Sequence, residues 1–159
     1  MCGIIAISNH PDASFIVRSG LHHLQHRGQE AAGIASVVSG NIDRVRKRGR
    51  VLEVLTNDDC KNLVSDKSIG HVRYSTEGGP SGSNSQPLYA NLNIGQIAVV
   101  HNGHIQNYRE LRKVLETKGA IFQTHTDTEI FLHLIARASG DIKSRIHQAC
   151  DIVLGSFCL

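Results

Sequence analysis

The first seven residues of the chain, Met-Cys-Gly-Ile-Ile-Ala-Ile, constrain its fold more than any other stretch. Residues 3–7 form an unbroken apolar run in which apolar and polar side chains do not alternate. Such a run predicts a β-strand buried on both faces, although periodicity alone leaves a short helix open. Chain ends are usually loose, so a buried first strand would hold the residue before it in a fixed place.

That residue is Cys2, which directly follows the initiator methionine. If Met1 is removed, Cys2 carries a thiol and a free α-amine. The amine can then take the proton of the thiol near neutral pH, so one residue supplies both a nucleophile and a base. The structural alternative is that Cys2 is merely a small apolar residue at the start of a core strand. The first seven residues leave both interpretations open.

The composition indicates one globular domain. The chain has 159 residues, of which 40% are hydrophobic and 19% charged. No apolar run approaches the roughly 18 residues of a membrane-spanning helix, so we expect no membrane association and no export signal. The four cysteines, at positions 2, 60, 150 and 158, show no paired spacing, which favours reduced thiols in the cytoplasm.

The charge pattern argues against nucleic acid and metal as partners. The net charge of +3 is spread along the chain apart from a basic cluster over residues 44–50, where alternating apolar residues favour a solvated strand. His22 and His26 lie one helical turn apart, but the glutamate of a zinc-hydrolase motif is missing beside His22. We therefore expect no nucleic acid and no metal. A metal-dependent hydrolase that uses the histidines is the weaker alternative.

Apolar periodicity predicts a mixed α+β chain with largely antiparallel sheets. Helices are expected from residue 15 to before Gly28 and over 58–66, 108–118, 130–136 and 142–153. A hairpin is expected around residues 28–41, with further strands over 69–74, 94–100 and 156–159.

Three loop features add to this pattern. Thr126 to Glu129 has the spacing of a capping box before the 130–136 helix. The polar stretch from Ser75 to Pro87 has the composition of a mobile lid over a pocket. His101-Asn102-Gly103 follows an apolar run and predicts a sharp turn at a strand end, where polar groups are delivered.

Six short motifs follow one another along the chain, and together they resemble the class II glutamine amidotransferases, which are N-terminal-nucleophile hydrolases. The motifs are Cys2-Gly3-Ile4, Arg27-Gly28 through Ala32-Gly33-Ile34, Gly70 to Thr76, Asn84 to Pro87, His101-Asn102-Gly103 and Asp127-Thr128-Glu129. The resemblance covers residues 2 to about 138. It implies the family's four-layer αββα sandwich, two antiparallel sheets between helices, as a single domain over residues 1–159.

The resemblance also implies the catalytic groups. Cys2 attacks the γ-amide carbon of glutamine, and the products are glutamate and ammonia. The side-chain amide of Asn102 and the backbone N–H of Gly103 form the oxyanion hole that stabilises the tetrahedral intermediate. Taken alone, Asn102-Gly103 is an ordinary turn sequence.

The remaining implied residues bind the amino-acid end of the substrate. Arg73 holds the α-carboxylate and Asp127 the α-ammonium group. Thr76, His71 and His101 are expected as lesser contacts. Taken alone, Asp127 is also placed to cap a helix, and His101 could be a satisfied core histidine.

Residues 24–34 most resemble the branch of the family whose second half is a phosphoribosyltransferase, acting at the first committed step of purine synthesis. That half is absent, so we expect a C-terminally truncated glutaminase domain. Glutamine is the expected substrate, the absent half the expected acceptor partner, and a homo-oligomer the expected complete protein. We expect no cofactor in this domain, because Mg²⁺ is implied only for the absent half. The alternatives are the glutaminase domain of another class II amidotransferase and a catalytically silent regulatory domain of the same fold.

Overall fold

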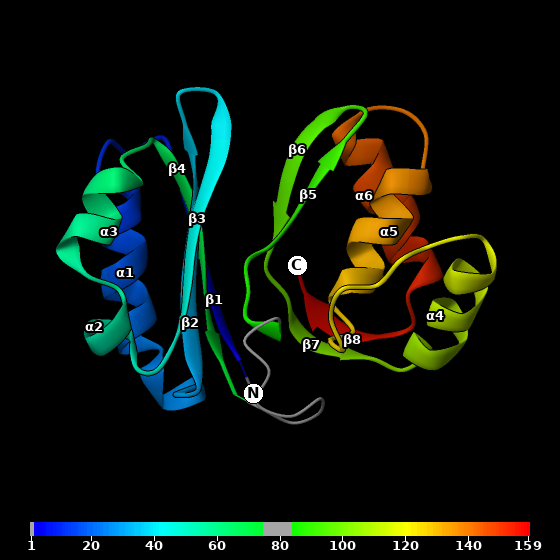
Figure 1. Cartoon of the computed structure of the whole chain (residues 1–159), viewed down its shortest axis with the longest axis horizontal. Coiled ribbons are helices and arrows are strands. Elements are labelled where there is room, and N and C mark those ends of the chain that lie inside the picture. The colour runs from blue at the N-terminus through cyan, green and yellow to red at the C-terminus, as the bar shows by residue number, and fades with distance from the viewer. Residues whose placement is uncertain (1, 75–83) are drawn as a thin grey trace.

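The computed structural model describes residues 2–74 and 84–159, which form four layers (Figure 1). Helices α1–α3 lie on the outer face of a four-stranded sheet, and a second layer of strands faces that sheet from the other side. Helices α4–α6 lie outside the second layer of strands. This arrangement confirms the predicted αββα sandwich of the α+β class.

The first sheet is antiparallel throughout and has the strand order β1-β4-β2-β3. Its strands are β1 (Gly3–Ser8), β2 (Ala31–Val38), β3 (Asn41–Arg48) and β4 (Lys67–Arg73). Gly3 lies opposite Val72, so Cys2, which precedes β1, is brought to the end of β4 where Arg73 lies. The register of this strand pair therefore decides where the Cys2 thiol is placed.

The β2–β3 hairpin confirms the turn that the sequence predicts. The two residues between the strands, Ser39 and Gly40, both have positive φ, 50° and 83°. Positive φ at both central residues is the geometry of a type I′ turn, whose twist matches that of the flanking strands.

Apolar side chains of the first helix layer form one core with the first sheet. The layer consists of α1 (Ala13–His23), the 3-10 turn Gln25–Arg27, α2 (Val51–Val54) and α3 (Asn57–Asn62). Val17 and Leu21 of α1 are fully buried over β4. A Cβ at Gly70 would lie 2.4 Å from Val17 Cγ1 and 2.8 Å from Leu21 Cδ1, so glycine allows α1 to approach the sheet this closely.

The second half of the chain builds the other two layers. Two small sheets, β5 (Leu88–Leu92) with β6 (Gly95–Val99) and β7 (Asn102–Ile105) with β8 (Gly155–Cys158), are covered by α4 (Tyr108–Thr117), α5 (Glu129–Arg137) and α6 (Ile142–Ile152). Ile105, Phe131 and Ile135 are fully buried in the core between these strands and helices. Phe157 of β8 packs edge-on against Phe131, with ring centroids 5.1 Å apart.

Two local predictions are wrong. Residues 3–7 are not buried on both faces, because β1 is an edge strand: Ile5 and Ile7 pack against the first core, whereas Ala6 on the opposite face is exposed. The capping box at Thr126–Glu129 does not form, because the Glu129 carboxylate accepts hydrogen bonds from Gln123 and Thr124 instead. Local spacing could not show that a loop would compete for this side chain.

Within residues 2–74 and 84–159, none of the helices has the length and apolar character that crossing a bilayer requires.

The packing of α1 yields a stability prediction. Leu21→Ala should lower the free energy of unfolding by about 2 to 5 kcal/mol, because it leaves a cavity in a fully buried core. The matched control is Leu52→Ala, since Leu52 lies on α2 with 51% of its surface exposed and should cost about 0.5 kcal/mol or less. Urea denaturation followed by circular dichroism measures both, and equal losses would contradict this account of the core.

Candidate functional site

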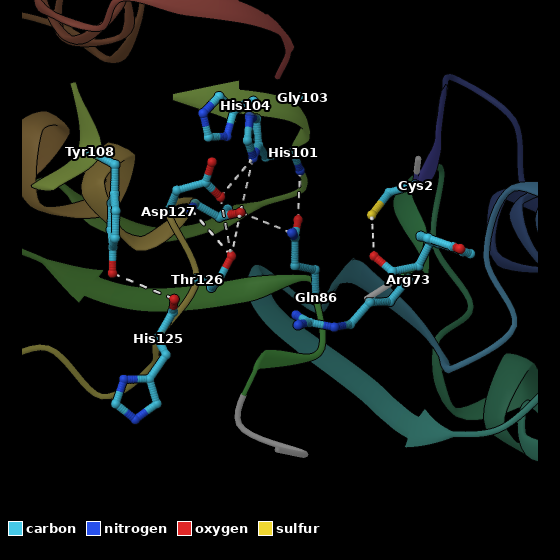
Figure 2. A pocket seen from close by; sticks show the side chains of 12 residues that line it. Cys2, Arg73, Gln86, His101, Gly103, His104, Tyr108, His125, Thr126 and Asp127 are labelled. Carbon is cyan, nitrogen blue, oxygen red and sulfur yellow. Dashed lines mark hydrogen bonds and ion pairs between the residues drawn. The ribbon is translucent and has the colours of Figure 1, made fainter. Parts of the chain in front are cut away.

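A cavity of about 80 Å³ lies between the two layers of strands, where β1 begins and β4 ends (Figure 2). The first half of the chain contributes Cys2, Arg73 and Tyr74, and the second half contributes all other lining residues. The lining residues from the second half are Gln86, His101, Gly103, His104, Tyr108, His125, Thr126, Asp127 and Thr128. The cavity therefore exists only because the two halves of the sandwich face each other.

Cys2 is held by contacts from two other segments. The Arg27 Nε–H donates to the Cys2 carbonyl oxygen at 2.9 Å, which fixes the backbone just before β1. The thiol lies 3.8 Å from the carbonyl oxygen of Tyr74, to which it donates. Figure 2 shows Cys2 on one side of the cavity and Gly103 and Asp127 on the other.

Arg73 is the last residue of β4, and only 6% of its surface is exposed. Its Nη1 donates to the Asn84 carbonyl oxygen at 2.6 Å, and its Nε lies 3.4 Å from the Glu30 carboxylate. A buried guanidinium is costly unless it is paired and hydrogen-bonded, and both kinds of contact are present. The cavity thus has a fixed positive charge in its wall.

Asp127 and His101 face each other on the opposite side. Asp127 Oδ2 accepts from the backbone N–H of Ile105 in β7 at 3.1 Å, and Asp127 Oδ1 lies 3.6 Å from His101 Nδ1. The same Nδ1 lies 3.0 Å from the Thr128 hydroxyl. The helix-cap interpretation of Asp127 is wrong, since Thr128 is the residue before α5 and the Asp127 carboxylate accepts a hydrogen bond from Ile105 of β7 instead.

Burial lowers the pKa of His101, an effect that the Asp127 carboxylate opposes and nearby His104 reinforces. A histidine with a lowered pKa is mostly neutral at pH 7. Because the neutral imidazole of His101 does not neutralise the Asp127 carboxylate, that carboxylate is available to pair with a cationic group in the cavity.

Asn102 and Gly103 open strand β7, where they lie opposite Cys158 and Phe157 of β8. The predicted sharp turn is therefore wrong, because β8 comes from the far end of the chain and extends the strand. A Cβ at Gly103 would lie 2.3 Å from the Ser156 carbonyl oxygen, so only glycine fits here. Gly103 lines the cavity, whereas half-buried Asn102 is not among the lining residues.

Of the other two expected contacts, Thr76 and His71, the structure places only His71. Thr76 lies outside the described residues, as does most of the expected lid. His71 is 1% exposed on β4 and does not line the cavity, and neither ring nitrogen has a hydrogen-bond partner among the described residues. Burial is the main reason that the pKa of His71 falls to about 3. The His101 backbone lies close enough to oppose this fall, although its geometry is too poor for a hydrogen bond, and the Arg73 charge lowers the pKa further.

Sequence reasoning gave no role in binding or catalysis to several residues of the wall, namely Tyr74, Gln86, His104, Tyr108, His125, Thr126 and Thr128. Gln86 was visible only as part of the Asn84–Pro87 motif. Since these residues come from segments far apart in the chain, including strand β7 and helix α4, no spacing rule could have grouped them. No cluster of three or more histidine, cysteine, aspartate or glutamate residues able to hold a metal ion occurs in the described parts of the chain.

Comparisons with known proteins agree on one family. A family described as "Glutamine amidotransferase domain" matches residues 71–159. An amidophosphoribosyltransferase of Lacticaseibacillus casei is 44% identical over 98% of this chain and 81% of that protein. Amidophosphoribosyltransferase 3 of Arabidopsis thaliana is 41% identical over 99% of this chain and 30% of that protein.

Solved structures give the same picture. The glutamine phosphoribosylpyrophosphate amidotransferase from B. subtilis, complexed with ADP and GMP, superposes with a TM-score of 0.90 at 36% identity. The match covers 99% of this chain and 34% of that one. The chain thus spans about a third of the length of the Arabidopsis and B. subtilis relatives.

The burial of His71 predicts a pH dependence of stability. Between about pH 6.5, the value for an unfolded histidine, and about pH 3, the unfolded chain binds a proton that the folded chain does not. The free energy of unfolding must therefore fall as the pH is lowered through this window. From pH 7.5 to 5.0 we expect His71 to account for a loss of about 2 kcal/mol.

His71→Asn isolates this contribution, because asparagine is polar but does not titrate. Urea unfolding at both pH values should show a larger loss of stability in the wild type than in the variant. Identical losses in the two proteins would mean that His71 is not buried in its neutral form.

Proposed function

This chain belongs to the glutamine amidotransferase domain family, and we propose that it is a glutaminase domain that hydrolyses the side-chain amide of glutamine to glutamate and ammonia. One observation carries the proposal. The two halves of the sandwich bring a thiol (Cys2), a cation (Arg73), an anion (Asp127) and a strand-end glycine (Gly103) to one cavity. These are the groups that an amino acid with a reactive amide requires.

The proposed nucleophile is Cys2, whose α-amine becomes free when Met1 is removed. The α-amine takes the thiol proton, through a water molecule because amine and thiol on one residue align poorly, and the sulfur attacks the amide carbon. The carbon–nitrogen bond then breaks, the proton passes to the leaving nitrogen, and ammonia departs from a γ-glutamyl thioester. Water adds to the thioester, the carbon–sulfur bond breaks, and glutamate and the thiol are released.

The wall of the cavity supplies the groups that orient the substrate. Arg73 binds the α-carboxylate, and its contacts with Glu30 and Asn84 hold the guanidinium still. Asp127 binds the α-ammonium group, since neutral His101 leaves its negative charge available. We assign stabilisation of the oxyanion that develops on the carbonyl oxygen to the backbone N–H of Gly103, which lines the cavity, and to the side-chain amide of Asn102, the residue beside it.

We further propose that the ammonia serves a phosphoribosyltransferase acceptor half in a longer protein. The relatives named amidophosphoribosyltransferase, 41% and 44% identical to this chain, support that acceptor. We assign Mg²⁺ binding to that acceptor half, and the subunit contacts of a homo-oligomer to the complete protein. All four cysteines are free, which supports a reducing compartment such as the cytoplasm.

The second candidate, a catalytically silent domain of the same fold, applies if the α-amine of Cys2 stays blocked. A mass spectrum of the intact purified chain distinguishes the two, because it reports directly whether Cys2 is the first residue.

Cys2→Ala should reduce glutamine hydrolysis by at least about 10³-fold, because loss of the nucleophile in a covalent mechanism removes most of the rate enhancement. Cys150→Ala is the matched control, since Cys150 is a half-buried thiol on α6 outside the cavity. Ammonia release is measured in a coupled assay on processed protein. Hydrolysis that survives Cys2→Ala at the wild-type rate would refute the proposed function.

A glutamine analogue with a diazoketone in place of the amide should label Cys2 alone. Burial raises the pKa of the Cys60 and Cys150 thiols, so few of them are thiolates at pH 7. Cys158 is exposed and does not line the cavity. Peptide mass spectrometry locates the label, and modification of Cys158 at a comparable rate would show that the analogue reacts without binding.

A further inference from the structure

Gln86 is a buried side chain that joins two parts of the cavity wall contributed by the second half of the chain (Figure 2). It is 4% exposed. Its Oε1 accepts from the backbone N–H of His101 at 2.6 Å, and its Nε2 donates to the Thr128 hydroxyl at 2.9 Å. Both ends of the amide are thus engaged by protein groups.

The two partners lie beside the groups assigned to catalysis and binding. His101 is two residues before Gly103, and Thr128 directly follows Asp127. The Thr128 hydroxyl also lies 3.0 Å from His101 Nδ1, so the amide closes a small buried network. A shift of Gln86 would therefore move the backbone of β7 and the Asp127 segment relative to each other.

Asn84, two residues earlier, makes a similar connection to the first half of the chain. Its carbonyl oxygen accepts from Arg73 Nη1 at 2.6 Å, and its side-chain Oδ1 accepts from the His125 backbone N–H at 3.0 Å. The segment over residues 84–86 therefore connects Arg73 with the segment that carries Asp127.

We propose that Gln86 is a positioning residue for amide hydrolysis: through the His101 backbone and Thr128 it holds the oxyanion donors of β7 in register with the Asp127 segment. This inference rests on the proposed glutaminase function. It concerns the transition state more than substrate binding, because negative charge reaches the oxyanion donors only as the tetrahedral intermediate forms.

The effect of losing Gln86 follows from the geometry. Hydrogen bonds in a buried network are strong, and an unpaired backbone N–H at His101 would have to find a new partner by moving. A misplacement of about 1 Å in a catalytic group can cost about 10²-fold in rate. We therefore expect Gln86→Met, which keeps the length of the side chain and removes both hydrogen bonds, to lower kcat by about 10- to 100-fold.

Gln96→Met is the matched control. Gln96 on β6 also bridges two groups, since it accepts from the Ile42 N–H at 2.5 Å and donates to Asn41 Oδ1 at 3.4 Å, but it lies outside the cavity wall. The variant should keep the wild-type kcat. For Gln86→Met, we expect KM to stay within about 3-fold and iodoacetamide to alkylate Cys2 at the wild-type rate, because neither depends on the oxyanion donors.

Gln86→Glu supplies a readout that a purely structural role would not change. A carboxylate still accepts from the His101 N–H but has no hydrogen to donate to Thr128, whereas the protonated acid does both. Burial raises the pKa of a carboxyl group, so the population of the protonated form increases as the pH falls from 8 to 6. The kcat of Gln86→Glu relative to wild type should therefore rise as the pH is lowered, while the ratio for Gln86→Met stays flat.

The outcomes separate the inference from the function on which it rests. If the wild type hydrolyses glutamine and Gln86→Met has the same kcat, the positioning role alone is overturned. Equal losses of kcat in Gln86→Met and Gln96→Met would overturn it as well. If Gln86→Met does not fold, the pH profile of Gln86→Glu decides, and a flat ratio overturns the role. A wild-type protein with Cys2 as its first residue and no glutamine turnover overturns the proposed function and this inference together.

Discussion

The antiparallel pairing of β1 with β4 is the interaction on which the rest of the site depends. Six residue pairs, from Gly3 opposite Val72 to Ser8 opposite Lys67, fix the start of the chain, which would otherwise be free to move. A slip of one residue would turn every side chain of β1 to the opposite face and carry the Cys2 thiol away from Arg73. Ile5 and Ile7 oppose such a slip because they pack into the core beneath the first helix layer. The apolar run at the start of the sequence thus specifies a register, and the register places the nucleophile.

The interior of the sandwich divides apolar and polar burial between different layers. The two large apolar clusters lie between helices and strands, on the outer side of each layer of strands. The polar side chains of the site, among them Arg73, Asn84, Gln86 and His101, are buried between the layers of strands. Buried polar groups are expensive unless they are hydrogen-bonded. The bonds from Asn84 and Gln86 meet that requirement and join segments that the sheet hydrogen bonds do not connect.

The sequence predicted most of the elements and the broad fold, because these follow from local pattern. The β2–β3 hairpin was predicted correctly from its turn residues, and α4 and α6 from apolar spacing. The predictions that failed concern features that are decided by contacts with residues far away in the chain. The β1 run gives no sign of being at a sheet edge, which is decided by the order β1-β4-β2-β3. Asn102-Gly103 lies in a strand instead of a turn because β8, more than 50 residues later, pairs with it.

For the site, too, the sequence indicated individual residues but not the contacts that join distant segments. The motifs named Cys2, Arg73, Gly103 and Asp127, and the structure brings all four to one cavity, whereas Asn102 and His71 are near it without lining it. Gln86 carried no signal as an individual residue, because its importance lies in two bonds to segments 15 and 42 residues away. Contacts of this kind are fixed by the assembled sandwich and have no local signature in a sequence.

The division of burial implies that stability and catalysis depend on different residues of this domain. A core leucine is held by many apolar contacts, each insensitive to direction, so its loss changes the free energy of unfolding with little effect on angles in the cavity. A buried polar side chain contributes only about 1 kcal/mol per hydrogen bond to stability, but its bonds fix both distance and direction. Since the nucleophile and the Arg73 cation come from the first sheet, and the oxyanion donors and the Asp127 anion from the second layer, catalysis requires the two layers to keep one relative position. Hydrogen bonds from Arg73, Arg44 and Arg46 of the first sheet to the carbonyl oxygens of Asn84, Pro87 and Ser85 help to specify this position, and for catalysis their geometry matters more than their energy.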